Sequence, residues 1–232
     1  QQDSVSHQTK QDGWCAVCAS SVWLTLGVSL AHVAVLGTGS IGTTHLRVLS
    51  TINGAVPIAV PLRAERRNQL SQEGYQIAVD LDDAVRLRAK LCIVATDTSR
   101  HVADGISALE RGLDVLMEKP MALDAPSAQQ LNKRAVDLGR KLFIGCVMRF
   151  SASLTSFREI RNRVGQPHSV HVECRSYLPD WRPSRPYLNS YSARPDEGGV
   201  MRDLIHEIDY AGWIFGWPDS TFATIKNTGR LG

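Results

Sequence analysis

The run VAVLGTGSIG, residues 33–42, constrains the fold of this chain more than any other feature. A short apolar strand runs directly into three glycines, and a helix is expected over residues 41–52. In such a turn the first glycine allows a sharp bend, the second lets backbone amides approach a pyrophosphate, and the third lets the helix pack on the sheet. The positive end of the helix then faces the phosphates. The pattern predicts a dinucleotide-binding turn, and its alternative is a glycine-rich turn in an unrelated α/β protein. The cofactor-binding residues predicted here are Gly37, Thr38, Gly39, Ser40, Ile41 and Gly42.

Strand-like and helix-like runs alternate after this turn, which is typical of a parallel, doubly wound sheet. The expected strands after the first are residues 56–60, 77–79, 91–95, 115–117 and 142–146. The expected helices are residues 64–72, 81–88, 101–111 and 125–138, with Ser99 and Asp124 as N-caps and Gly112 and Gly139 as C-terminal stops. Six strands in this rhythm predict an α/β Rossmann domain over residues 32–150.

The pattern changes after residue 150. Residues 151–164 predict a helix, residues 169–176 alternate as a strand does, and a further helix and strand are expected over 200–215 and 221–226. Between them, residues 177–199 form a long loop rich in proline, arginine and tyrosine, and loops of this length in compact proteins are usually functional or disordered. We therefore expect residues 151–232 to form a second, α+β unit for substrate binding and oligomerisation.

Composition excludes several other classes of protein. The chain has 232 residues, of which 43% are hydrophobic and 21% charged, with a formal net charge of +3. These values are typical of a soluble globular protein, and without a basic stripe we expect neither nucleic-acid nor membrane partners. Five cysteines are an odd number, which favours a reducing compartment and hence the cytoplasm. The pair Cys15 and Cys18 has no second pair of ligands, so we expect no metal site.

Residues 14–31 carry no charged side chain and could be mistaken for the core of a signal peptide. However, the chain begins with glutamine, no arginine pair precedes the apolar run, and the first Rossmann strand follows immediately. We interpret residues 1–31 as a poorly ordered upstream extension, such as a start-site artefact would produce. A cleaved signal peptide is the alternative.

Two groups of polar residues could carry chemistry. Glu118, Lys119 and Pro120 follow the fifth expected strand, at the carboxyl edge where open α/β sheets bind ligands. Farther on, Asp203, His206 and Asp209 are spaced three apart and would share one broad face of a helix. A histidine flanked by carboxylates can transfer protons, because a carboxylate fixes its tautomer and stabilises the imidazolium. The alternatives are a surface lysine beside a turn and a solvated polar helix face.

Taken in order, these segments resemble the Gfo/Idh/MocA oxidoreductases, the group of glucose-fructose oxidoreductase and inositol dehydrogenase. The resemblance covers residues 32–232 and rests on GTGSIG, VATDTSRH, EKP, MRF and GGVMRDLIHEIDYAGWIFG. It implies that Lys119 and His206 are catalytic. Many members place an aspartate four residues before the histidine, whereas here Arg202 holds that position and Asp203 lies three before. Asp203 and Asp209 are therefore the candidates for orienting the histidine.

The resemblance also implies a substrate domain that needs roughly a hundred further residues. This chain ends at Gly232, so we expect an incomplete domain, a longer homo-oligomeric enzyme, and poor stability from unpaired sheet edges. Further cofactor-binding residues are expected after the second, fourth and fifth strands. They are Arg63, Ala95, Thr96, Asp97, His101, Glu118 and Lys119.

The end of the second strand bears on cofactor choice. An acidic residue there would bind the ribose of NAD, whereas arginine favours the extra phosphate of NADP. Arg63, Arg66 and Arg67 occur here with no carboxylate before Glu65, which favours NADP over NAD unless these arginines are only a solvated helix face.

The expected reaction is reversible hydride transfer between NAD(P) and a CH–OH group of a sugar, sugar derivative or cyclitol, with His206 as acid–base and Lys119 stabilising the oxygen. Substrate contacts are expected from the MRF segment and the long loop, with an anionic sugar as a weaker hypothesis raised by Arg182, Arg185 and Arg194. The substrate-binding residues predicted are Arg149, Tyr177, Trp181, Tyr191 and Arg194. The alternative function is an inactive nucleotide-binding module or sensor.

Overall fold

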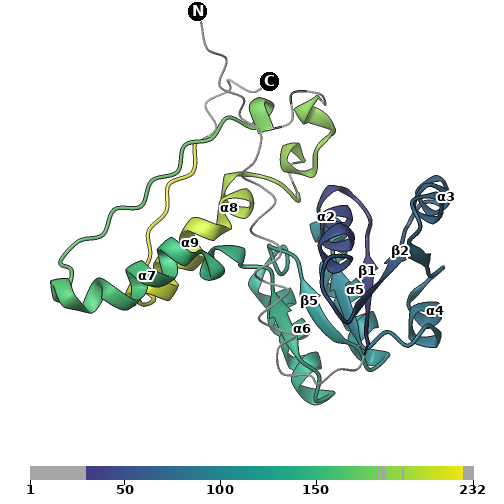
Figure 1. Ribbon diagram of the computed structural model, residues 1–232. Helices are drawn as coiled ribbons and strands as arrows, with labels where there is room; N and C mark the ends of the chain where they lie inside the picture. The colour runs from purple at the N-terminus through teal and green to yellow at the C-terminus, as the bar shows by residue number, and fades with distance from the viewer. Residues whose placement is uncertain (1–29, 182, 184–185, 195, 227–232) are drawn as a thin grey trace, which may run out of the picture.

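The computed structural model describes residues 30–181, 183, 186–194 and 196–226 (Figure 1). The predictions for residues 1–29, including the Cys15 and Cys18 pair, lie outside the described residues. So do those for Arg182 and Arg185, on which the hypothesis of an anionic substrate partly rested.

Six parallel strands form one sheet in the order β3-β2-β1-β4-β5-β6. The chain crosses from one side of β1 to the other after β3, which is the doubly wound arrangement predicted. The α/β Rossmann fold is therefore confirmed. The strands are β1 (Ala31–Leu36), β2 (Ala55–Val60), β3 (Gln76–Ile77), β4 (Leu91–Val94), β5 (Asp114–Met117) and β6 (Leu142–Ile144).

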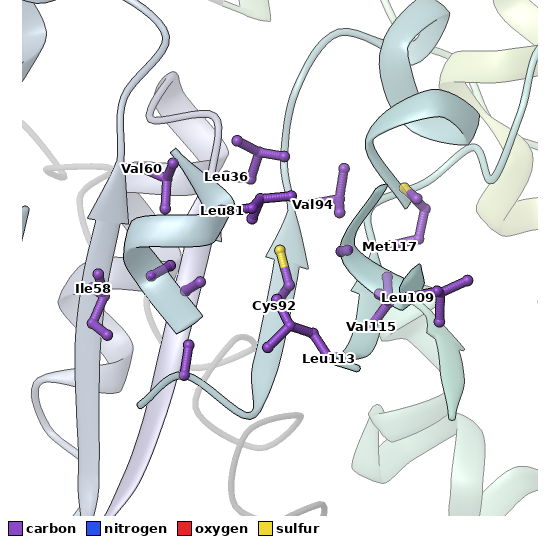
Figure 2. Close-up of a cluster of buried hydrophobic side chains, with 14 of the residues drawn as sticks. Leu36, Ile58, Val60, Leu81, Cys92, Val94, Leu109, Leu113, Val115 and Met117 are labelled. Atoms are coloured by element: carbon purple, nitrogen blue, oxygen red, sulfur yellow. The ribbon is translucent and has the colours of Figure 1, made fainter. Parts of the chain in front are cut away.

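Alternate residues of the central strands point to opposite sides of the sheet. Both faces are buried because helices cover each of them. Val33 and Val35 of β1 pack with Leu46 of α2 (Ser40–Leu49) and Leu70 of α3 (Ala64–Gln72). The other face packs against α4 (Leu81–Arg86), α5 (His101–Glu110) and α6 (Ala125–Asp137). Figure 2 shows this second cluster, which contains Leu36, Ile58, Val60, Leu81, Cys92, Val94, Leu109, Leu113, Val115 and Met117.

The helix ends follow the sequence signals at three of the four positions predicted. The Asp124 carboxylate caps α6 by accepting a hydrogen bond from the Ser127 amide at 2.8 Å. Gly112 and Gly139 end their helices with φ of 76° and 62°, a conformation that favours glycine. The prediction of Ser99 as an N-cap is wrong, because Ser99 lies inside the short helix η1 (Thr98–Arg100), which runs directly into α5.

The short helix η2 (Val147–Phe150) follows the sheet, and the second region, after residue 150, begins with α7 (Ala152–Ile160) and η3 (Arg161–Val164). The helix predicted over residues 200–215 is instead two helices, α8 (Val200–Asp203) and α9 (Ile205–Phe215), interrupted where Leu204 has ψ of 28°. The long loop contains the short helices η4 (Leu178–Trp181), η5 (Tyr187–Asn189) and η6 (Tyr191–Ala193).

Two predicted strands of the second region are wrong. Residues 169–176 and 221–226 are extended but pair with no strand among the described residues (Figure 1). Their apolar side chains are exposed, from 37% at Val172 to 93% at Phe222. Residues 169–176 do alternate, and residues 221–226 have a strand-like composition, but a strand also needs a neighbour that accepts and donates its backbone hydrogen bonds.

Candidate functional site at the carboxyl edge of the sheet

The register of the sheet gathers three predicted segments at one edge. Leu36 at the end of β1 pairs with Val94 at the end of β4, and Val94 pairs with Met117 at the end of β5. The residues that follow these ends are therefore neighbours. Two backbone bonds extend the ladder there, from the Ala95 amide to Leu36 at 2.8 Å and from the Glu118 amide to Val94 at 3.0 Å.

Close packing requires glycine at two of the three glycine positions of the turn. Gly37 has φ of 86°, and a side chain there would lie 2.7 Å from the Ala95 carbonyl oxygen. A side chain at Gly42 would lie 1.9 Å from the Gly37 carbonyl oxygen. At Gly39, by contrast, no atom lies within 4 Å of the added carbon, so this glycine leaves open space in front of the helix. That space is where a pyrophosphate could approach the backbone.

The amino end of α2 suits an anion. Its first turn contains no acidic residue, and its N-cap Gly39 offers no side-chain cap, so the amide dipoles there face outward uncompensated. Ser40 and Ile41 are exposed at this end, whereas Thr38 is buried. Nearby, the Thr96 hydroxyl is buried and has no hydrogen-bond partner among the described residues. These features fit the phosphates and a polar group of a dinucleotide.

The arginines after β2 occupy different positions. Arg63 is exposed and precedes α3, with its side chain not engaged in capping the helix. Arg66 donates to the Thr38 carbonyl at 3.3 Å and to the Thr43 hydroxyl at 2.9 Å, so its guanidinium supports the glycine turn. Arg67 is partly buried, and its Nε has no hydrogen-bond partner among the described residues, so of the three arginines only Arg63 is exposed.

Glu118 is buried and paired with a histidine that the sequence analysis did not identify. His45 Nε2, from α2, lies 2.6 Å from Glu118 Oε1, and the other carboxylate oxygen accepts the Lys119 amide at 3.2 Å. Burial opposes ionisation of this carboxyl, but the hydrogen bonds and charges of His45 and Lys119 together outweigh it and lower the pKa of Glu118. The sequence signal for this pair was the position of His45, the sixth residue of the helix that follows the glycine turn.

Lys119 and the α8–α9 break meet at this edge. Lys119 Nζ donates to the Asp203 main-chain carbonyl at 3.2 Å, and the Asp203 carboxylate accepts the Ser192 hydroxyl at 3.1 Å. His206 is partly buried, and its Nδ1 has no hydrogen-bond partner among the described residues. Burial, followed by the nearby charge of Lys119, lowers the pKa of His206. A neutral imidazole beside a lysine ammonium is therefore the state favoured at neutral pH.

Asp209 is held by another partner. It receives two hydrogen bonds from the Arg149 guanidinium, at 2.8 and 2.7 Å. This bidentate pair joins α9 to η2, so Arg149 is engaged within the protein and no bond links Asp209 directly to His206.

Cys146, three residues before Arg149, is half-buried, and burial raises the pKa of its thiol to about 11. Cys146 is consequently a thiol rather than a nucleophilic thiolate at neutral pH.

His101 and Asp97, both predicted to bind cofactor, have different partners. His101 is buried, with Nδ1 2.7 Å from the Pro120 carbonyl oxygen and Nε2 3.0 Å from the Thr96 carbonyl oxygen. Asp97 is exposed and accepts a hydrogen bond from Arg194 at 3.2 Å, which connects the long loop to the Rossmann sheet. Ala95 is buried at the strand end.

The residues predicted to bind substrate do not all gather in one place. Trp181 and Tyr191 line a small hollow together with Tyr187, within the long loop. Tyr177 is 55% exposed, and Arg194 is paired with Asp97 and Glu197. A larger cavity of about 660 Å³ lies between the turn after Lys119, the start of α6 and α8, and its lining is mainly apolar. None of the five predicted substrate-binding residues lines that cavity.

No group of three or more histidine, cysteine, aspartate or glutamate side chains within the part of the chain that the structure describes is arranged to hold a metal ion. Within the same residues, no helix has the length and apolar character needed to cross a bilayer.

Comparisons with known proteins identify the family of this chain. Residues 31–146 match the Gfo/Idh/MocA model, described as an oxidoreductase family with an NAD-binding Rossmann fold. Inositol 2-dehydrogenase from Streptomyces avermitilis is 31% identical over 81% of this chain and 54% of its own length. 2,7-Anhydro-N-acetylneuraminate hydratase from Mediterraneibacter gnavus is 28% identical over 86% of this chain and 53% of its own. The chain thus spans about half the length of the curated relatives it matches.

Among solved structures, scyllo-inositol dehydrogenase from Lactobacillus casei superposes with a TM-score of 0.65, at 20% identity, over 82% of this chain and 56% of that protein. At this identity the likeness shows the fold alone. The family match covers the whole Rossmann sheet, and it includes the glycine turn, the buried Glu118 and Lys119 described above. The chain therefore belongs to the Gfo/Idh/MocA family of oxidoreductases with an NAD-binding Rossmann fold.

Proposed function

We propose that this protein transfers a hydride between NAD(P) and a CH–OH group of a sugar, sugar derivative or cyclitol. The observation that carries the proposal is the meeting of Lys119 and the α8–α9 segment of His206 at the edge where the glycine turn opens. A lysine bonded across 84 sequence positions to this segment joins the nucleotide-binding sheet to the second region at this edge. The inositol dehydrogenase relatives support a polyol substrate.

The chain's own residues divide the work. Gly39 and the amino end of α2 would hold the pyrophosphate, and Thr96 would offer its buried hydroxyl to the cofactor. A bound nicotinamide supplies the hydride acceptor or donor. His206, kept neutral by burial and by Lys119, would accept the proton of the substrate hydroxyl in the oxidation direction. The Lys119 ammonium would stabilise the negative charge that develops on the same oxygen.

The same proposal includes NADP as the preferred cofactor. Arg63 is the exposed guanidinium at the end of β2, and the described residues place no carboxylate between Val60 and α3. We expect Arg63→Ala to weaken NADP binding about tenfold in calorimetry while NAD binding changes less than twofold. An equal loss for both nucleotides would show that Arg63 does not read the extra phosphate.

Setting and assembly complete the proposal: a cytoplasmic enzyme that forms a homo-oligomer. Cys92, Cys146 and Cys174 are free thiols in the structure, which supports a reducing compartment. Size-exclusion chromatography with light scattering measures the oligomeric state, and a monomer at micromolar concentration would contradict this part.

The decisive experiment combines binding and turnover. NAD and NADP are titrated by calorimetry, and a panel of sugars and inositols is assayed for nicotinamide reduction. We expect Lys119→Ala and His206→Ala to reduce kcat about 10²-fold or more with nucleotide binding retained. Lys133→Ala, an exposed lysine paired only with Asp137 on α6, is the matched control and should keep full activity. Unchanged turnover in the first two variants would overturn the proposal, and nucleotide binding without any turnover in the starting chain would favour a binding module.

A further inference from the structure

The turn that carries Lys119 is fastened on one side through Glu118. The His45–Glu118 pair is nearly inaccessible, with 8% and 12% of the two side chains exposed. Gly145, beyond β6, makes room for it, because a side chain there would lie 3.2 Å from Glu118 Oε2. Since that oxygen also accepts the Lys119 amide, the carboxylate links α2 directly to the backbone of the lysine.

The same turn is fastened on the other side through Pro120. His101 is only 2% exposed, and both of its ring nitrogens lie within hydrogen-bond distance of main-chain carbonyl oxygens. One of these oxygens belongs to Pro120 and the other to Thr96 at the end of β4. Both oxygens are acceptors and a neutral imidazole has one N–H group, so a neutral ring donates to one carbonyl while it packs against the other. In either tautomer the buried ring lies between two segments of the site.

We infer that His45 and His101 are positioning residues for Lys119: two buried histidines, one acting on the residue before the lysine and one on the residue after it. This inference deepens the proposed function and rests on it for the role of Lys119. A lysine side chain has a flexible four-carbon stem. Its amine can therefore be held in one position only if the backbone at its Cα is fixed. A displacement of about 1 Å at a catalytic group can cost about 10²-fold in rate.

The test uses paired variants of each histidine. His45→Leu removes the donor to Glu118, whereas His45→Gln keeps an N–H group at a similar reach. The double variant His45→Leu/Glu118→Leu removes both partners and leaves no unpaired buried charge, so it guards against simple misfolding. His101→Leu and His101→Gln form the second pair. Leu113→Ala, a buried core change just before β5 at the opposite end of the strand, controls for general loss of stability.

Three readouts separate positioning from a purely structural role. With the best polyol of the panel, the Leu variants and the double variant should lower kcat about tenfold or more, with KM and nucleotide binding within about threefold. The Gln variants should recover most of the rate. Leu113→Ala should lower the unfolding midpoint without lowering kcat at a temperature where it is folded.

The third readout does not depend on catalysis. Trapping of Lys119 by pyridoxal phosphate and borohydride, followed by mass spectrometry of the peptide, reports how accessible the amine is. We expect the labelling rate in the double variant to change at least threefold from that of the starting chain. Labelling and kcat both within twofold in the double variant and in His101→Leu would overturn the inference. If the starting chain shows no turnover, the proposed function fails, while the labelling comparison still decides whether the histidines fix the lysine.

Discussion

Strand β2 and the segment of residues 169–176 both carry β-branched apolar side chains, but β2 is apolar throughout, the later segment alternates apolar and polar residues, and their surroundings differ. In β2, Ile58 and Val60 are buried because β1 and β3 pair on either side and helices cover both faces. In the later segment, Val170 and Val172 are 44% and 37% exposed, and no described strand pairs with it. The comparison shows that apolar, β-branched side chains make a strand possible, while hydrogen-bonding neighbours and a covering layer make it form. The same contrast separates the Rossmann sheet from most of the region after residue 150.

Among the variants that test this contrast, we expect Gly42→Ala to lower the free energy of unfolding the most. Its added carbon would meet the Gly37 carbonyl oxygen at 1.9 Å, and two backbone segments would have to separate. We expect a loss of about 3 kcal/mol or more in the free energy of unfolding, measured with urea. Gly39→Ala is the matched control, because its space is open and its φ of −70° suits alanine. Equal midpoints for the two variants would contradict the packing described for the turn.

A second pair of variants compares the two regions directly. Leu131→Ala empties a fully buried site in the α5–α6 core and should cost about 3 kcal/mol. Phe222→Ala removes a side chain that is 93% exposed and should change the free energy of unfolding by less than about 0.5 kcal/mol. Denaturant unfolding at two protein concentrations measures both. A large loss for Phe222→Ala that depends on concentration would break the comparison, because it would mean that another copy covers this segment.

The titration of His206 tests whether the second region is organised around the first. Burial and then the charge of Lys119 lower the pKa of His206, so the neutral base persists to lower pH than for an ordinary histidine. An NMR titration should therefore show its midpoint below 6.5. Lys119→Ala removes the second cause and should raise the midpoint while burial still holds it down. An unchanged midpoint in Lys119→Ala would mean that the charge of Lys119 does not act on His206. It would argue against placing the two residues in one site.

The smallest effect compares a helix cap from each region. The Asp124 carboxylate accepts the Ser127 amide at 2.8 Å, whereas the Ser151 hydroxyl lies 3.5 Å from the Leu154 amide and also contacts Ser153. Asp124→Ala should cost about 1 kcal/mol and Ser151→Ala less than half of that. Thermal unfolding of both variants checks the order. A larger loss at Ser151 would show that the second region depends on local capping more than its geometry indicates.

Sequence patterns predicted the Rossmann sheet because each part of it has a local cause. The contact of Gly42 with Gly37, the Asp124 cap and the Gly139 stop act within a few residues, and the apolar strands are buried on both faces. The predictions failed where a partner distant in the chain decides the outcome, as in residues 169–176 and 221–226. The break at Leu204 was not predicted either, because the helical sequence pattern continues through it. In the structure, Lys119 bonds the carbonyl of the preceding residue, Asp203.

For the site, the sequence alone determined which residue types follow the ends of β1, β4 and β5, including Lys119, and that His206 stands in a later helical segment. Only the tertiary structure decided their partners: Glu118 with His45, His101 with Pro120, and Asp209 with Arg149. Each of these pairs joins residues 19 or more positions apart. Spacing along the chain encodes helical and strand neighbours, but a buried polar pair forms only where folding brings donor and acceptor together away from water.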